Sequence, residues 1–258
     1  MYPKIVLICL MLGLGGAAVA QSGPSTREDI IELMGQLPEL NGMRERLAAQ
    51  GFSGEKLALA EDHERRLMTD EAVTGYIADR LIAVYDGNLP RAWAPEGLIA
   101  PLFDNGFTHL STADKTLYFQ VQLAVLNSMR PRDCGLLIKG RLSEQRAGRL
   151  VGQAESRLST STLRRYYALQ REAIRSGINR APRTLSPADS ARIQEKINET
   201  LRQRIEADPA LRPIGAALGN LNRATPVHAC GAAKLYYDVV LKMKGRDLQH
   251  ALIYLNDL

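Results

Sequence analysis

The spacing of apolar residues constrains the fold of this chain most strongly, because they recur every three or four positions. Val73, Ile77, Leu81 and Val84 follow this spacing, which places them on one side of a predicted helix over about 70–86. A second stripe contains Leu142, Ala147, Leu150, Val151, Ala154 and Leu158. No stretch after residue 20 alternates convincingly between apolar and polar residues, and no Asn-Gly turn joins two β-rich runs. The sequence predicts an all-α bundle of roughly eight to ten helices.

Helix boundary signals agree with this fold class. Thr69 is expected to be the N-cap of the helix over about 70–86, and Gly87 its end. Ser111, with an aspartate three residues later, predicts the start of another helix, which Pro131 follows. Gly245 separates two predicted helices at the end of the chain.

The first twenty residues have the pattern of a cleavable signal peptide. Lys4 precedes an uncharged apolar run from Ile5 to Ala20, and this run ends in Ala-Val-Ala, the small-x-small pattern that signal peptidases cleave. The run is short for a membrane span, which needs about 20 residues. Cys9 follows the bulky Ile8, so a lipoprotein cleavage site is not expected there. The sequence predicts export to the periplasm or beyond, and no transmembrane segment in the mature chain.

We expect residues 21–258 to form a single all-α domain with a strong charge asymmetry. Residues 21–130 hold ten basic and sixteen acidic side chains, whereas residues 131–258 hold twenty-two basic and twelve acidic ones. The segment 177–187 is predicted to be an exposed linker. The segment 208–229 mixes three prolines with two glycines and is predicted to be a long connection with at most a short helix inside it.

Cys134 and Cys230 are the two cysteines that remain after signal removal, and each lies in a similar Cys-Gly phrase. An even cysteine count in an oxidising compartment favours a structural disulfide. Three other interpretations remain open. A metal site has only His228 as a near neighbour, a redox pair is usually Cys-x-x-Cys, and a nucleophilic thiol would need His228 or His109 as its base.

Arginine supplies most of the positive charge of the second half. Several arginines recur at spacings of three, four or seven residues, so that pairs of them project from the same side of a helix. Guanidinium groups bind carboxylates and phosphates through paired donors. The candidate anion- or partner-binding residues are Arg146, Arg149, Arg157, Arg164, Arg165, Arg171 and Arg175. The alternative is that these arginines are solvated, or pair with the acidic first half.

The partner class expected for such a surface is another protein or an anionic envelope component, such as a lipid headgroup or lipopolysaccharide phosphate. Nucleic acid is not expected, because the protein is predicted to be exported and no series of aromatic residues accompanies the arginines. We predict no metal and no cofactor.

Motifs of hydrolases and phosphate-binding loops are absent from the sequence. His63 in "EDHERR" lacks the second histidine of a zinc-protease motif, and no Gly-x-Ser-x-Gly occurs. Glu155-Ser156 resembles the catalytic Glu-Ser of lysozyme-like transglycosylases, which implies a general-acid role for Glu155. Their Gly-Leu-Met-Gln type segment is missing, and Arg149 and Arg157 are expected to lower the pKa of Glu155. The sequence therefore favours a non-enzymatic binding protein of the accessory, adaptor or effector-neutralising type, and a peptidoglycan hydrolase is the alternative.

Overall fold

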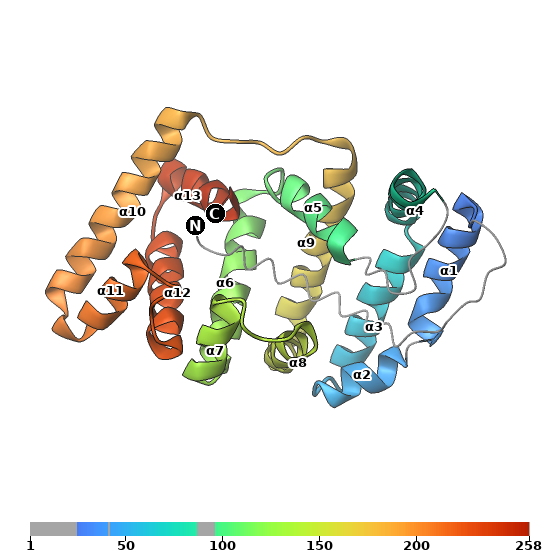
Figure 1. Ribbon diagram of the computed structural model, residues 1–258, viewed down its shortest axis with the longest axis horizontal. Coiled ribbons are helices and arrows are strands. Elements are labelled where there is room, and N and C mark those ends of the chain that lie inside the picture. The colour runs from blue at the N-terminus through green and yellow to red at the C-terminus, as the bar shows by residue number, and fades with distance from the viewer. Residues whose placement is uncertain (1–24, 41, 87–95, 258) are drawn as a thin grey trace. The chain divides into compact units, whose positions relative to one another are not determined.

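The computed structural model describes residues 25–40, 42–86 and 96–257, and these residues form thirteen α-helices and one 3-10 helix without a β-strand (Figure 1). The predicted all-α fold is confirmed, with a few more helices than the eight to ten expected. The predicted signal peptide, residues 1–20, and Gly87 lie outside the described residues. Among the described helices, none combines the length and apolarity that a membrane crossing requires.

The described helices divide between two compact units. The N-terminal unit comprises the described residues up to His109 together with Glu155–Pro182. The C-terminal unit comprises Leu110–Ala154 and Arg183–Leu258, as far as these residues are described.

The N-terminal unit is built from six helices: α1 (Arg27–Leu40), α2 (Met43–Ala49), α3 (Gly54–Thr69), α4 (Glu71–Tyr85), α5 (Glu96–Phe107) and α9 (Thr160–Asn179). Helix α9 packs against α5, α3 and α4, and α1 packs against α3 and α4. Val73, Ile77 and Leu81, which follow the predicted apolar spacing, are buried in the core. Val84 is 59% exposed, so the buried stripe of α4 ends before it.

Glycine allows α5 and α9 to approach each other closely. A Cβ atom on Gly106 would lie 1.7 Å from the carbonyl oxygen of Ala173, and one on Gly177 would lie 1.8 Å from that of Leu102. The segment without helical structure is shorter than the predicted linker over 177–187. It runs from 180 to 186, because α9 continues through Gly177 to Asn179.

The C-terminal unit contains α6 (Thr112–Ser128), α7 (Pro131–Ile138), α8 (Glu144–Glu155) up to Ala154, α10 (Pro187–Ala207), α11 (Arg212–Gly219), α12 (Pro226–Leu241) and α13 (Gly245–Asp257). The 3-10 helix η1 (Pro209–Leu211) lies between α10 and α11. Helix α12 is central in this unit, because α6, α7, α10, α11 and α13 all contact it.

Side-chain caps define several helix starts, as the sequence indicates. The Ser111 hydroxyl accepts a hydrogen bond from the backbone N–H of Asp114 at 3.1 Å, which confirms the predicted start of α6. The expected N-cap at Thr69 is wrong. Thr69 is the last residue of α3, and the carboxylate of Asp70 caps α4 by accepting from the N–H groups of Ala72 and Val73. Two helices follow each other there with a single residue between them, and a carboxylate suits the positive end of the second helix.

Candidate functional site

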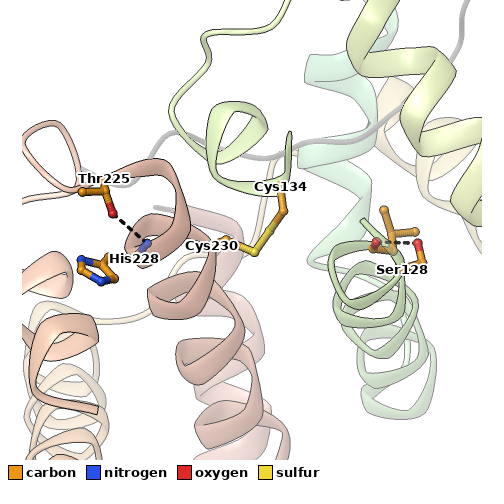
Figure 2. The surroundings of a disulfide bond; sticks show 6 residues. Ser128, Cys134, Thr225, His228 and Cys230 are labelled. Carbon is orange, nitrogen blue, oxygen red and sulfur yellow. Dashed lines mark hydrogen bonds between the residues drawn. A yellow bond between two sulfur atoms is a disulfide. The ribbon is translucent and has the colours of Figure 1, made fainter. Parts of the chain in front are cut away.

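A disulfide between Cys134 and Cys230 joins α7 to α12, so the predicted bridge is confirmed (Figure 2). The two Cα atoms lie 5.4 Å apart, and 96 positions separate the residues in the sequence. Both helices begin with a proline at their first position, and both cysteines are buried. The bridge uses both thiols, which excludes their interpretation as metal ligands or nucleophiles in this state.

The glycine of each Cys-Gly phrase explains why the two phrases look alike. A Cβ atom on Gly135 would lie 1.6 Å from the carbonyl oxygen of Pro226. A Cβ atom on Gly231 would lie 2.8 Å from a side-chain carbon of Ile214 on α11. Each phrase therefore supplies one half of the disulfide and one site of close helix packing.

The end of α7 is also fastened to the segment that precedes α12. The Lys139 ammonium donates to the carbonyl oxygens of Asn222 at 3.0 Å and of Ala224 at 2.5 Å. Later residues of α7 contact earlier residues of the segment from Asn222 to Cys230. The helices α7 and α12 therefore run antiparallel. The hydroxyl of Thr225 accepts from the N–H of His228 and caps α12 beside the bridge (Figure 2).

Asp133 connects α7 to α8. Its buried carboxylate accepts from Arg130 at 2.8 Å and from Arg146 at 2.8 Å. Burial acts to raise the pKa of Asp133, but the hydrogen bonds and charges of the two arginines outweigh it and hold the pKa below its usual value. Arg146, one of the predicted binding residues, therefore positions the start of α8.

Four other arginines, in the segments 130–149 and 220–228 that adjoin the bridged cysteines in the chain, are exposed and have no ion pair within the described part of the chain: Arg132, Arg141, Arg149 and Arg223. We call these four residues the arginine surface. The segments that carry it, 130–149 and 220–228, hold seven basic side chains and two acidic ones. One of the two acids, Asp133, is buried between arginines. Val227, beside this surface on the first turn of α12, is 53% exposed.

The remaining predicted arginines belong to the N-terminal unit. Arg164 and Arg175 lie eleven positions apart on α9, and Arg171 lies between them on the same side of the helix. Arg164 pairs with Glu55 at 2.6 Å, and Arg175 pairs with Asp70 at 3.0 Å. This side of α9 therefore forms ion pairs with acidic residues of the first half. Arg157 and Arg165 are exposed and also have interaction partners.

The same side of α9 faces a buried histidine on α3. His63 stacks on Tyr167 with ring centroids 4.2 Å apart and an interplanar angle of 3°. Arg171 lies 3.1 Å from His63 Nδ1 and can only donate, so this nitrogen is the acceptor. Burial and the Arg171 charge lower the pKa of His63 to about 3, although a hydrogen bond with Gln170 acts in the opposite direction. His63 is therefore neutral at physiological pH.

Glu64, the next residue, forms a part-buried ion pair with Arg46 of α2. Two hydrogen bonds of 2.6 and 3.3 Å join the guanidinium to the two carboxylate oxygens. Burial raises the pKa of Glu64, and Arg46 partly offsets this effect.

Glu155, at the end of α8, is buried beside this pair. Burial, followed by the negative charge of Glu64, raises its pKa to about 8. The expectation that Arg149 and Arg157 lower this pKa is wrong, because both arginine side chains are exposed whereas the Glu155 carboxyl is buried next to another carboxylate. Glu155 therefore retains its proton at neutral pH.

The burial of His63 and Glu64 was not predicted, although the spacing of the neighbouring apolar residues indicates it. Leu57, Ala60, Leu67 and Met68 form the buried side of α3, and His63 and Glu64 fall on that side at the same three-to-four spacing. The side chains of α9 that contact His63, Tyr167 and Gln170, are distant in the sequence, so this contact could not be read from it.

The remaining histidines have local roles. His109 Nε2 contacts the carbonyl oxygen of Ala181 at 2.8 Å, and His250 lies against Asp189 at 3.4 Å. Within the described ranges, no group of three or more His, Cys, Asp or Glu side chains is arranged to hold a metal ion.

Comparisons of this chain with protein-family models, with curated proteins and with solved structures find no match.

Proposed function

We propose that this chain is an exported, non-enzymatic protein that binds an acidic protein of the cell envelope through its arginine surface. The observation that carries the proposal is the set of four exposed arginines, next to a buried disulfide, that form no ion pair with any described residue. Unpaired guanidinium groups can offer their paired donors to carboxylates of a partner at no cost in broken internal salt bridges.

The exposed Val227 favours a protein partner over a lipid headgroup or a phosphate group. Protein interfaces combine arginine with apolar contact area, whereas a headgroup offers charge alone. Arginine is also enriched among the residues that contribute most to protein binding energy. The bridge and the Lys139 contacts hold the backbone of this surface in place, so little conformational entropy is lost on binding.

Export supports the same proposal. The predicted signal peptide directs the chain to the envelope, and a buried disulfide suits an oxidising compartment. The periplasm is the proposed location.

The test is a pull-down from the envelope fraction of the native cell with the tagged mature protein, followed by quantitative mass spectrometry. The triple variant Arg141→Ala, Arg149→Ala and Arg223→Ala should reduce recovery of an acidic protein at least tenfold, which corresponds to about 1.4 kcal/mol. Recovery by the unchanged protein should fall steeply as salt rises from 50 to 500 mM, because exposed charges are screened.

The matched control is the triple variant Arg44→Ala, Arg66→Ala and Arg202→Ala. It removes the same charge, but each of these arginines already pairs with a carboxylate of the chain. Equal loss of the partner in both triple variants would refute the proposal. Binding to vesicles that contain anionic lipid, without recovery of an acidic protein, would assign the surface to lipid instead.

A second candidate function, peptidoglycan hydrolysis, is favoured by the raised pKa of Glu155. A carboxylic acid that keeps its proton near neutral pH can act as a general acid, and a second carboxylate, Glu64, lies close enough to raise that pKa. Against this role, Glu155 is only 6% exposed and Glu64 only 5%.

Release of soluble fragments from purified peptidoglycan distinguishes the two functions. If the protein hydrolyses peptidoglycan, the unchanged protein should release fragments and Glu155→Gln should not. Glu172→Gln is the control and should still release them, because Glu172 is an exposed glutamate on α9 of the same unit. The binding proposal predicts no release by any of the three proteins.

A further inference from the structure

Two glutamates of the N-terminal unit, Glu64 and Glu155, are both buried, and the charge of Glu64 acts on Glu155. Glu64 is joined to Arg46 by a bidentate pair, whereas two effects act on Glu155, burial and the charge of Glu64. Both residues are at most 6% exposed. Burial of two ionised carboxylates with one guanidinium would leave a net negative charge in a medium of low dielectric.

Within the described residues, the two basic side chains packed between α3 and α9, His63 and Arg171, do not balance the second carboxylate. His63 on α3 is held neutral, because its Nδ1 accepts from Arg171 and its ring stacks on Tyr167. Arg171 on α9 donates to this histidine. Burial and the charge of Arg66 lower the pKa of Arg171, whereas the charge of Asp62 acts to raise it. Arg157, which follows α8, is exposed.

The backbone next to Glu155 is attached to the segment that begins α3. The ammonium of Lys56 donates to the carbonyl oxygen of Ser156 at 2.9 Å. A Cβ atom on Gly51 would lie 3.1 Å from the Ser156 hydroxyl oxygen, so the chain at Gly51 passes directly over Ser156. The two short segments 51–56 and 155–156 are thus in contact next to the buried Glu155.

We propose that the proton on Glu155 is a lock that keeps segment 155–156 packed against α2 and α3, and that loss of this proton opens the contact. While the carboxyl is neutral, Arg46 balances Glu64 and the cluster carries no net charge. Once the carboxyl ionises, the repulsion from Glu64 and the cost of a buried charge are both relieved when Glu155 reaches water. The N-terminal unit would therefore respond to alkaline conditions through one local contact.

Hydrogen exchange of backbone amides in 51–58 and 155–159 tests this proposal, with rates corrected for the intrinsic effect of pH. Between pH 6.5 and pH 9, the corrected exchange in both segments should rise about thirtyfold, because the equilibrium constant for opening increases about tenfold per pH unit up to the folded pKa of about 8 and levels off above it. Glu155→Gln, which mimics the protonated carboxyl, should remain protected at pH 9. Glu172→Gln, the exposed control on α9, should behave like the unchanged protein.

The proposal is overturned if the unchanged protein shows no rise, or if Glu155→Gln shows the same rise. Carbon-13 NMR of the glutamate carboxyls provides a measurement that does not depend on any variant being stable. One carboxyl should titrate near pH 8, and its signal should change in step with the exchange rates. Titration of every glutamate below pH 6 would contradict the proposal.

Discussion

At the scale of single residues, two buried side chains make the stability of the protein depend on pH in opposite directions: His63 on the acid side and Glu155 on the alkaline side. The folded pKa of His63, about 3, lies below its ordinary value of 6.5, so its contribution to stability is lost as the pH falls from 6.5 toward 3. The folded pKa of Glu155, about 8, lies above its ordinary value of 4.5. Its contribution is therefore complete below pH 4.5 and is lost as the pH rises toward 8.

The free energy of unfolding of the N-terminal unit should accordingly be highest between about pH 4.5 and pH 6.5, where the two slopes cancel. Urea unfolding followed by circular dichroism at pH 3–9 measures this profile. Glu155→Gln should remove most of the decline above pH 6.5 and leave the decline on the acid side. The absence of a decline between pH 6.5 and pH 9 in the unchanged protein would show that Glu155 is ionised throughout.

Gly135 provides a second prediction at this scale. Gly135→Ala places a Cβ atom where the carbonyl oxygen of Pro226 lies, 1.6 Å away, so α7 and α12 must separate. We expect a loss of about 2–4 kcal/mol in the free energy of unfolding, measured by urea titration. Gly35→Ala is the control, because no atom lies within 4 Å of its added Cβ in α1, and it should stabilise by about 0.5–1 kcal/mol. Equal effects of the two substitutions would contradict the packing described.

At the scale of helices, ion pairs to α3 differ in value according to their burial. Arg46→Leu leaves the buried Glu64 without its partner and should cost about 3–5 kcal/mol. Arg164→Leu breaks a pair with Glu55 in which both side chains are at least 60% exposed, and it should cost less than about 1 kcal/mol. Thermal or urea unfolding measures the stability of both variants. A larger loss of stability in Arg164→Leu than in Arg46→Leu would contradict this ranking of the two ion pairs.

The disulfide is the other contribution at this scale, because it links α7 and α12 across 96 positions. On the chain-entropy model, a loop of that length stabilises the folded state by about 4–5 kcal/mol. The double substitution Cys134→Ala and Cys230→Ala should lower the free energy of unfolding of the C-terminal unit by a comparable amount. A non-reduced digest of the protein should contain the two cysteine peptides as one linked species, and free thiols would contradict the bridge.

The sequence was sufficient for local features of these elements and insufficient for contacts between distant ones. The spacing of Val73, Ile77 and Leu81 predicted a buried helical side, and Ser111 predicted a helix start, because both signals are contained within a few residues. The pKa of Glu155 depends instead on its burial and on the charge of Glu64, ninety-one positions away, and no local pattern indicated that the two would meet.

At the scale of the whole molecule, the arginines of the second half fall into two groups, which differ in whether they form ion pairs with described residues. In the N-terminal unit, Arg164 and Arg175 pair with acidic residues from the first half, as the alternative interpretation of the sequence described. In the C-terminal unit, the arginine surface lacks such partners within the described residues. A net positive charge that is left uncompensated on one unit is the basis of the proposed binding function.

Photocrosslinking in the native cell tests that function most directly. A photoreactive amino acid at position 141 or 223 of the exported protein should crosslink to one acidic envelope protein, and the yield should fall when Arg132 and Arg149 are replaced by glutamate. The same probe at position 202 on α10, where the arginine already pairs with Glu199 and Glu206, should not give this product. Equal crosslinking from all three positions, or a yield unaffected by the glutamate substitutions, would contradict binding through the arginine surface.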